Sequence, residues 1–264
     1  MKFPLIAIVF IISISSCKSQ ERDGNGQLIK ESITYKKIGN TFLKLYLFTS
    51  NKEDKKPVIV FFHPGGWVSG SPSFFFEKAE AFSSLGYTTI CVQYRLADLK
   101  TTTPKDCLND SKDALRYLKE NEEKLCLDMS MLFLVGYSAG GHLALMTQLN
   151  TGESIPMANK IFTIASPVDL TEDELLKTSM MTANEKIALS PTNHIKHLKT
   201  KLYLFNGTND EYIDYSTISN FSNKAEKMDK KVELTAFKNA GHFLLATMHK
   251  EKIEQKIKQE ILEK

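Results

Sequence analysis

The chain has 264 residues, of which 42% are hydrophobic and 25% charged, an ordinary globular composition with enough residues for one large hydrophobic core. The formal net charge of +3 is too small to indicate a nucleic-acid partner, because lysine and glutamate are interspersed rather than gathered in blocks. Apart from the N-terminal segment, no apolar run reaches the about 18 residues that indicate a membrane-spanning helix.

The N-terminal segment has the pattern of an export signal. Lys2 is followed by an apolar run of about 14 residues, whereas a spanning helix needs about 20, so residues 1–16 are predicted to be a signal peptide. The run ends in Ile14-Ser15-Ser16-Cys17, which resembles the lipobox of bacterial lipoproteins. That resemblance implies cleavage before Cys17 and diacylglycerol on its thiol, so that acyl chains alone would anchor the mature protein in the cell envelope. The alternative is an ordinary cleaved signal without a lipid.

A short tether is predicted to follow the signal. Residues 18–29, KSQERDGNGQLI, are polar and contain two glycines, a composition typical of flexible linkers. We therefore expect a lipid-anchored tether over 17–29 and one folded domain over 30–264, on the periplasmic or cell-surface side of a membrane. No repeat and no linker to a second domain interrupts residues 30–264.

The three cysteines that follow Cys17 are predicted to be packing residues. Cys91 lies in an apolar, strand-like run. Cys107 and Cys126 are 19 residues apart in a helical stretch, a separation of about 28 Å that no disulfide can bridge. No spacing of cysteine and histidine indicates zinc, and we expect neither a metal nor a cofactor.

The first half of the domain alternates strands and a helix. Residues 32–37 and 41–49 have the alternating pattern of two antiparallel strands. Residues 56–63 form a continuous apolar run that ends in glycines, as expected for a buried parallel strand. A helix is predicted over 74–86, after a proline that the first helical turn tolerates, and a strand over 88–94.

The second half continues the same alternation. Strands are predicted at 130–137, 160–166, 201–207 and 231–237, and helices at 105–125, 140–149 and 247–263. This order predicts an α/β fold with a mostly parallel sheet of about eight strands and helices on both faces. Residues 170–198 fit the alternation poorly and are predicted to form either a small cap or a surface excursion.

A serine motif lies between a predicted strand and a predicted helix. Gly136-Tyr137-Ser138-Ala139-Gly140 is G-x-S-x-G, and its strand–turn–helix context is the one in which the serine hydroxyl projects above a sheet as a nucleophile. The N–H of Ala139 would point to the same place from the start of the helix. A bare glycine-rich turn with an incidental serine is the alternative.

A nucleophilic serine needs a histidine base and an acid that orients it, in the chain order serine, acid, histidine. Asp210 follows the strand 201–207, and His242 follows the strand 231–237, so both would lie with Ser138 at the carboxyl edge of the sheet. Three other acids could serve in place of Asp210: Asp169, Glu211 and Asp214. Of the other histidines, His142, His194, His197 and His249 are expected to have structural or surface roles.

The sequence HPGGW, residues 63–67, follows the strand 56–63. A loop at this position supplies backbone N–H groups to an oxyanion hole in hydrolases with the G-x-S-x-G turn. Pro64 has no N–H, so the predicted donors are those of Gly65, Gly66 and Ala139. By itself, HPGGW could be only a tight turn.

Together these motifs resemble the esterase branch of the α/β-hydrolase superfamily that has an HGGG-type loop. That branch includes hormone-sensitive-lipase-like esterases and bacterial feruloyl and acetyl-xylan esterase-like proteins. Pro64 departs from the family by replacing the first glycine of the loop, and Asp214 stands where the family often has proline. The matching segments are HPGGW, VQYRLAD (92–98), PKDCLNDSKDALRYLKEN (104–121), GYSAGGHLAL (136–145), the S-P-x-x-H run that leads to the acid (190–216) and AGHFL (240–244).

The resemblance implies a serine carboxylic-ester hydrolase that acts through Ser138, Asp210 and His242. Its substrates would be small-molecule or glycan esters with short acyl groups of the acetyl or feruloyl type. A serine peptidase or amidase with the same triad is the alternative, and a non-catalytic binding protein of the same fold is a third hypothesis. Trp67 and Phe74–Phe76 are candidates to line a pocket, with core packing expected for at least two of the three phenylalanines.

Overall fold

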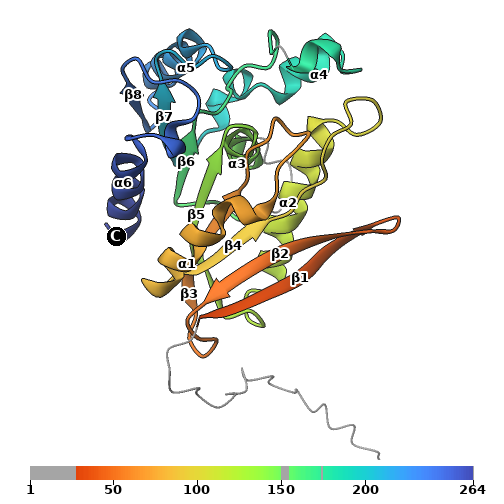
Figure 1. The fold of residues 1–264 in the computed structure, drawn as a ribbon, viewed down its shortest axis with the longest axis vertical. Helices are drawn as coiled ribbons and strands as arrows, with labels where there is room; N and C mark the ends of the chain where they lie inside the picture. The colour runs from red at the N-terminus through yellow and green to blue at the C-terminus, as the bar shows by residue number, and fades with distance from the viewer. Residues whose placement is uncertain (1–27, 150–154, 174, 264) are drawn as a thin grey trace, which may run out of the picture.

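One eight-stranded sheet organises the computed structural model, which describes residues 28–149, 155–173 and 175–263 (Figure 1). The strand order is β1-β2-β4-β3-β5-β6-β7-β8. β1 and β2 pair antiparallel with each other, β2 pairs antiparallel with β4, and all the other neighbours are parallel. The predicted signal 1–16, Cys17 and most of the tether lie outside the described residues.

The eight predicted strands are present, and the predicted mostly parallel α/β sheet is confirmed. Each parallel strand ends at the same edge of the sheet, so the loops that follow them share that edge. The strands are β1 (Ile29–Ile38), β2 (Thr41–Thr49), β3 (Lys56–Phe62), β4 (Thr88–Val92), β5 (Leu127–Tyr137), β6 (Lys160–Ile164), β7 (Lys201–Gly207) and β8 (Val232–Phe237).

Two of the helices were not predicted from the sequence, α4 within 170–198 and α5 after β7. α5 is rich in serine and asparagine, which favour helices weakly, and only three of its residues are buried. Asp214 caps it by accepting the N–H of Ser216. The α-helices are α1 (Phe76–Ser84), α2 (Pro104–Glu120), α3 (Ala139–Leu149), α4 (Ala183–Leu189), α5 (Tyr215–Lys227) and α6 (Lys250–Leu262).

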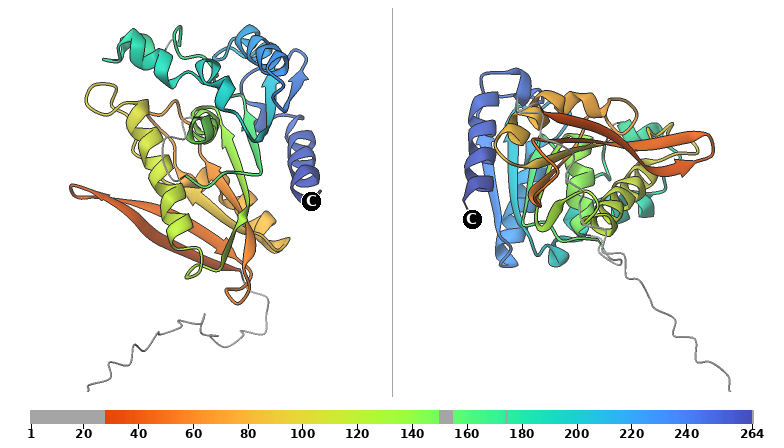
Figure 2. Two further views of the ribbon diagram at one scale, coloured as in Figure 1. Left: turned by 180° about the vertical axis from the view of Figure 1, so that it is seen from behind. Right: turned by 90° about the horizontal axis from the view of Figure 1, so that it is seen from below.

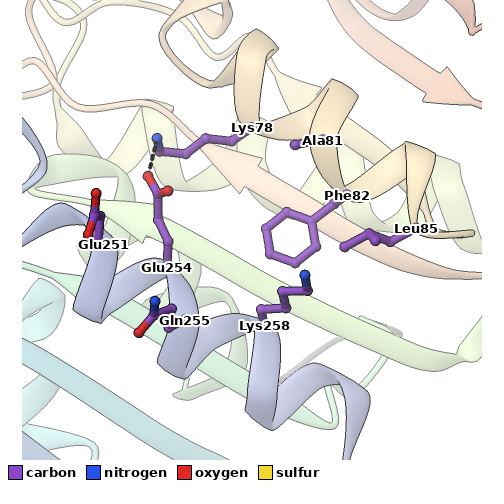
Figure 3. A pocket seen from close by; sticks show the side chains of 8 residues that line it. All are labelled: Lys78, Ala81, Phe82, Leu85, Glu251, Glu254, Gln255 and Lys258. Atoms are coloured by element: carbon purple, nitrogen blue, oxygen red, sulfur yellow. Dashed lines mark ion pairs between the residues drawn. The ribbon is translucent and has the colours of Figure 1, made fainter.

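Helices cover both faces of the sheet (Figure 2). Val58 and Val60 of β3 belong to the core beneath α2, α3 and α5, whereas Ile59 and Phe61 belong to the core beneath α1 and α6. Alternate residues of one strand therefore enter two different cores, which is why the strand is apolar throughout. On the second face, α1 and α6 lie side by side, joined by an ion pair between Lys78 and Glu254 (Figure 3).

The described residues of 170–198 form a short helical excursion. It contains α4 and three 3-10 turns, Leu175–Thr178, Pro191–Asn193 and Ile195–His197. The N–H of Met180 bonds the carbonyl of Leu99 after β4, and the N–H of Thr192 bonds the carbonyl of Val168 after β6. The excursion is thus fastened to loops at the carboxyl edge of the sheet. Within the described part of the chain, no helix is long and apolar enough to cross a membrane.

Candidate active site

Ser138 stands on a sharp turn between β5 and α3. Its φ of 52° lies in the left-handed region, which is unfavourable for a residue with a side chain. The turn is held by the Ser138 N–H, which bonds the carbonyl of Ile164 at 2.8 Å. A Cβ added at Gly140 would lie 2.0 Å from the Phe62 carbonyl oxygen, so only glycine allows the turn to pack against the end of β3.

The structure brings Ser138, His242 and Asp210 together. His242 Nε2 is 3.1 Å from Ser138 Oγ, and His242 Nδ1 is 2.9 Å and 3.0 Å from the two carboxylate oxygens of Asp210. The Asp210 side chain is fully buried, and its Oδ1 also accepts the N–H groups of Tyr212 and Ile213. These bonds hold the carboxylate against the imidazole, which fixes the direction of the ring.

The three competing acids do not contact the imidazole of His242. Asp214 caps α5, and Asp169 accepts hydrogen bonds from Thr171. Glu211 lies closer, because its Oε2 accepts the backbone N–H of His242 at 3.0 Å. Of the four candidate acids, Asp210 is the one whose carboxylate bonds the histidine ring.

The predicted oxyanion donors belong to the loop that follows β3 and to the start of α3. Gly65 and Gly66 have φ values of 132° and 58°, and Ala139 is the first residue of α3. Among the described residues, no group accepts a hydrogen bond from the N–H of Gly65 or Gly66. The N–H of Ala139 lies in the first helical turn, where no intrahelical acceptor exists. All three N–H groups are therefore free to bind a ligand oxygen.

His63 and Tyr94 hold the start of the HPGGW loop. Their rings stack with centroids 4.1 Å apart, and the Tyr94 hydroxyl donates to the carbonyl of His63 at 2.7 Å. His63 Nδ1 donates to the carbonyl of Pro64 at 2.8 Å. Burial lowers the pKa of His63 to about 4, so the ring is neutral near pH 7.

The remaining candidate histidines have structural contacts. His142 is completely buried between Trp67 and the carbonyl of Leu189. His194 Nε2 bonds the carbonyl of Ala188 within the excursion. The described residues contain no group of three or more His, Cys, Asp or Glu side chains that could hold a metal ion.

Aromatic rings surround His242, and most of them were not predicted from the sequence. Tyr212 and Phe243 lie 5.0 Å and 5.6 Å from the imidazole, with 66% and 55% of their surface exposed. Tyr137 stacks on the imidazole and donates its hydroxyl to the carbonyl of His242. Phe74 packs on Tyr137 and is 45% exposed. The sequence could have indicated these rings, because Tyr137, Tyr212 and Phe243 lie within two residues of Ser138, Asp210 and His242 in the chain.

Comparisons with known proteins identify the class of the fold. The structure superposes on esterase 2 of Thermogutta terrifontis with a TM-score of 0.80 and 29% sequence identity, over 89% of this chain and 94% of that one. Two features of the structure agree with this match: the mostly parallel sheet, and the sharp turn at Ser138 after β5. The chain is an α/β-hydrolase.

Sequence comparisons show which α/β-hydrolases the chain resembles. The family described as BD-FAE matches residues 43–167. Carboxylesterase NlhH of Mycobacterium tuberculosis is 37% identical over 36% of this chain and 30% of its own length. Isoprenylcysteine alpha-carbonyl methylesterase of Arabidopsis thaliana is 28% identical over 44% of this chain and 26% of its own length. The chain is therefore similar in fold and sequence to esterases of the α/β-hydrolase superfamily, and it spans less than two thirds of the length of these curated relatives.

Proposed function

We propose that the protein is a serine carboxylic-ester hydrolase in which Ser138 is the nucleophile, His242 the base and Asp210 the orienting acid. The observation that carries the proposal is the continuous contact from Ser138 Oγ through both ring nitrogens of His242 to the buried carboxylate of Asp210. The resemblance to esterases in fold and sequence supports the same reaction class.

The mechanism follows from these contacts. His242 Nε2 takes the proton of Ser138 as Oγ attacks the ester carbonyl, and the N–H groups of Gly65, Gly66 and Ala139 stabilise the tetrahedral oxyanion. His242 returns the proton to the leaving alcohol, which leaves the acyl group on Ser138. Water then attacks the acyl-enzyme with His242 again as base, and the acid is released. Each oxyanion donor lowers the barrier by about 3–4 kcal/mol.

The proposed substrates are short acyl esters of the acetyl or feruloyl type, with carbohydrate esters among them. The structural neighbour has been solved with propionate and with butyrate bound, which supports a small acyl site here. Tyr212 and Phe243 offer exposed ring faces beside His242, and Phe74 offers one beside Tyr137, on which an aryl or sugar ring can stack. The same triad could also cleave amides, so amide and peptide substrates belong in the assay panel.

Covalent labelling by paraoxon tests the nucleophile. The structural neighbour has been solved after phosphorylation by paraoxon. We expect Ser138 Oγ to displace 4-nitrophenolate from phosphorus, leaving one diethylphosphoryl ester that mass spectrometry locates on the peptide containing Ser138. Ser138→Ala should remain unlabelled. An adduct on another serine, or none at a concentration that labels a known esterase completely, would overturn the assignment.

The proposed location is the cell envelope, with Cys17 lipidated and the membrane contacted only through that anchor. The support is the order of basic residue, short apolar run and Ile14-Ser15-Ser16-Cys17. Cells that express the full chain should incorporate a radioactive fatty acid into the protein, and Cys17→Ser should abolish the label. An unlabelled wild-type protein would contradict the proposal.

A further inference from the structure

Trp67, in the HPGGW loop, has an unfavourable backbone conformation. Its φ is 66° and that of Gly66 is 58°, and the N–H of Val68 bonds the carbonyl of Gly65 at 3.1 Å. Two successive left-handed residues closed by this bond define a tight turn over 65–68 of the kind that favours Gly and Asn at both central positions. A tryptophan at the second position persists there only if its surroundings hold it.

Trp67 is held through both its backbone and its side chain. The carbonyl of Trp67 accepts the N–H of Ala97 at 2.8 Å. The indole is 2% exposed, and its Nε1–H donates to His142 Nδ1 at 3.3 Å, with the two rings perpendicular. The indole bond is directional, because one edge of the ring faces one nitrogen of the imidazole.

His142 can make this bond in one protonation state. It is completely buried, and its Nε2 is 2.8 Å from the carbonyl of Leu189 at the end of α4, which requires a proton on Nε2. The neutral ring then has a free lone pair on Nδ1, which is what the Trp67 N–H needs. Burial lowers the pKa of His142 to about 4 and favours this neutral state.

We propose that His142 is a positioning residue that sets the oxyanion loop through Trp67. His142 lies on α3, one turn after Ser138, so it fixes the 65–68 turn relative to the helix that carries the nucleophile. Through Leu189, the same imidazole ties this arrangement to α4 and the excursion at 170–198. The inference rests on the proposed esterase function, in which Gly65 and Gly66 donate to the oxyanion.

Three variants test the link. His142→Leu removes both hydrogen bonds, and Trp67→Phe removes only the indole N–H. His142→Asn is the conservative control, because its side-chain oxygen can occupy the place of Nδ1 and accept from Trp67. With p-nitrophenyl acetate, His142→Leu and Trp67→Phe should each lower kcat by about 10-fold to 100-fold, with KM changed by less than about 3-fold. His142→Asn should recover most of the lost kcat.

The double variant Trp67→Phe/His142→Leu should be no worse than His142→Leu alone, since His142→Leu already removes the bond that Trp67→Phe removes. A second readout does not depend on activity. Trp67 is the only tryptophan in the chain, so its fluorescence reports the turn directly. Acrylamide should quench the indole weakly in the wild type and in His142→Asn, and more strongly in His142→Leu.

The outcomes separate this inference from the proposed function. A wild type that hydrolyses no ester in the panel refutes the esterase, while quenching still decides whether His142 holds Trp67. If the wild type is active and a cooperatively folded His142→Leu keeps wild-type kcat and quenching, the positioning role is wrong. It is also wrong if His142→Asn is as impaired as His142→Leu, or if the losses in the double variant multiply.

Discussion

Asp210 and Asp214 are four residues apart, yet the structure gives them different tasks. Asp210→Asn should lower kcat by about 10³-fold to 10⁴-fold, because the amide can donate to Nδ1 and favour the wrong imidazole tautomer. Asp214→Asn should have little effect on kcat, since asparagine also caps a helix well. Steady-state kinetics on the two purified variants makes the comparison. A large kcat loss only in Asp214→Asn would reverse the assignment.

Pro64 and Gly65 are neighbours with opposite tolerance to change. A Cβ added at Gly65 would lie 2.1 Å from the Ser69 carbonyl oxygen, and the φ of 132° is unsuited to any side chain. Gly65→Val should therefore abolish most activity. Pro64→Gly should keep substantial activity, because Pro64 has no N–H and donates to nothing.

Ester turnover by both variants, with circular dichroism to verify folding, tests this account of the loop. A folded Pro64→Gly variant as inactive as Ser138→Ala would show that the proline has a role that its missing donor does not explain.

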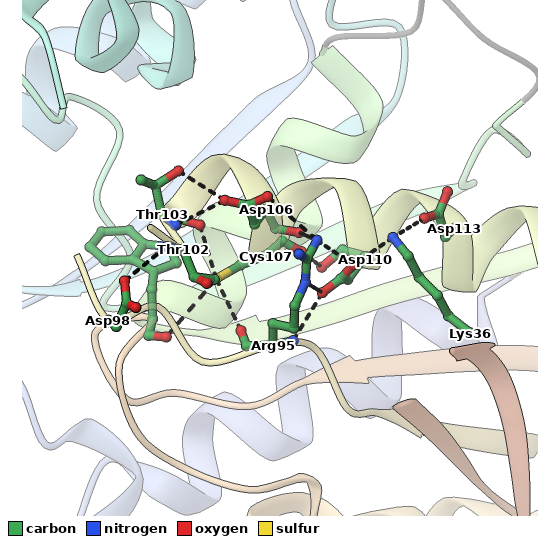
Figure 4. Close-up of polar contacts among 11 residues, drawn as sticks. Lys36, Arg95, Asp98, Thr102, Thr103, Asp106, Cys107, Asp110 and Asp113 are labelled. Atoms are coloured by element: carbon green, nitrogen blue, oxygen red, sulfur yellow. Dashed lines mark hydrogen bonds and ion pairs between the residues drawn. The ribbon is translucent and has the colours of Figure 1, made fainter. Parts of the chain in front are cut away.

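A polar cluster fastens α2 to the strands that precede it (Figure 4). The fully buried Asp110 accepts from Arg95 Nε at 2.7 Å and Nη2 at 3.0 Å, and from Lys36 Nζ at 2.7 Å. Arg95 follows β4 and Lys36 lies on β1, so one carboxylate joins three elements.

Asp110→Ala should lower the free energy of unfolding by about 3 kcal/mol. This value is at the lower end of the range expected when one partner of a buried ion pair is removed, because the side chains of Lys36 and Arg95 remain partly exposed. Urea denaturation measures the loss. Glu123→Ala is the matched control, since Glu123 pairs with Lys55 at an exposed site and its removal should leave stability almost unchanged. Equal stability of the two variants would contradict a structural role for Asp110.

The strands that are apolar over most of their length were predictable from the sequence, and so were the amphipathic β1 and α6, whereas α5 was not. β3, β5 and β7 are apolar over most of their length because both faces meet a core, which marks them as parallel strands. α5 was not predicted because its serine and asparagine residues favour helices only weakly, and only Ile218, Phe221 and Ala225 of its 13 residues are buried. α5 begins at the hydrogen bond from the Ser216 N–H to the Asp214 side chain. The sequence alone does not distinguish such a helix cap from a turn.

Two buried neutral histidines make the stability of the whole domain depend on pH. Burial lowers the pKa of both His63 and His142 to about 4, below the roughly 6.5 expected in the unfolded chain. The unfolded state therefore binds more protons between these values. Their contribution is fully present above about pH 6.5 and is lost as the pH falls towards 4, at up to about 3 kcal/mol for each histidine.

Urea unfolding at a series of pH values between 4 and 7 should show this loss. His142→Asn removes one titrating group and should flatten the dependence relative to the wild type. A free energy of unfolding that is constant from pH 7 to pH 4 would contradict the burial of two neutral imidazoles.

The chain order of Ser138, Asp210 and His242 was predictable from the sequence. The side-chain contacts between neighbouring loops and helices were not. Ser138, Asp210 and His242 follow three strands of one parallel sheet, so topology alone brings them to one edge. The contact of His142 with Trp67 and Leu189 joins three segments through side-chain directions that no sequence spacing encodes. The positions of Tyr137, Tyr212 and Phe243 around His242 likewise depend on the direction that each loop takes after its strand.

The central claim, that this domain hydrolyses esters through Ser138, is tested most directly by p-nitrophenyl acetate turnover of the purified domain beside Ser138→Ala. The account predicts saturable turnover by the wild type and a loss of at least about 10³-fold in kcat for the variant, whose fold should be intact. Equal rates for the two proteins, or no turnover by either across acetyl, butyryl and feruloyl esters, would contradict it.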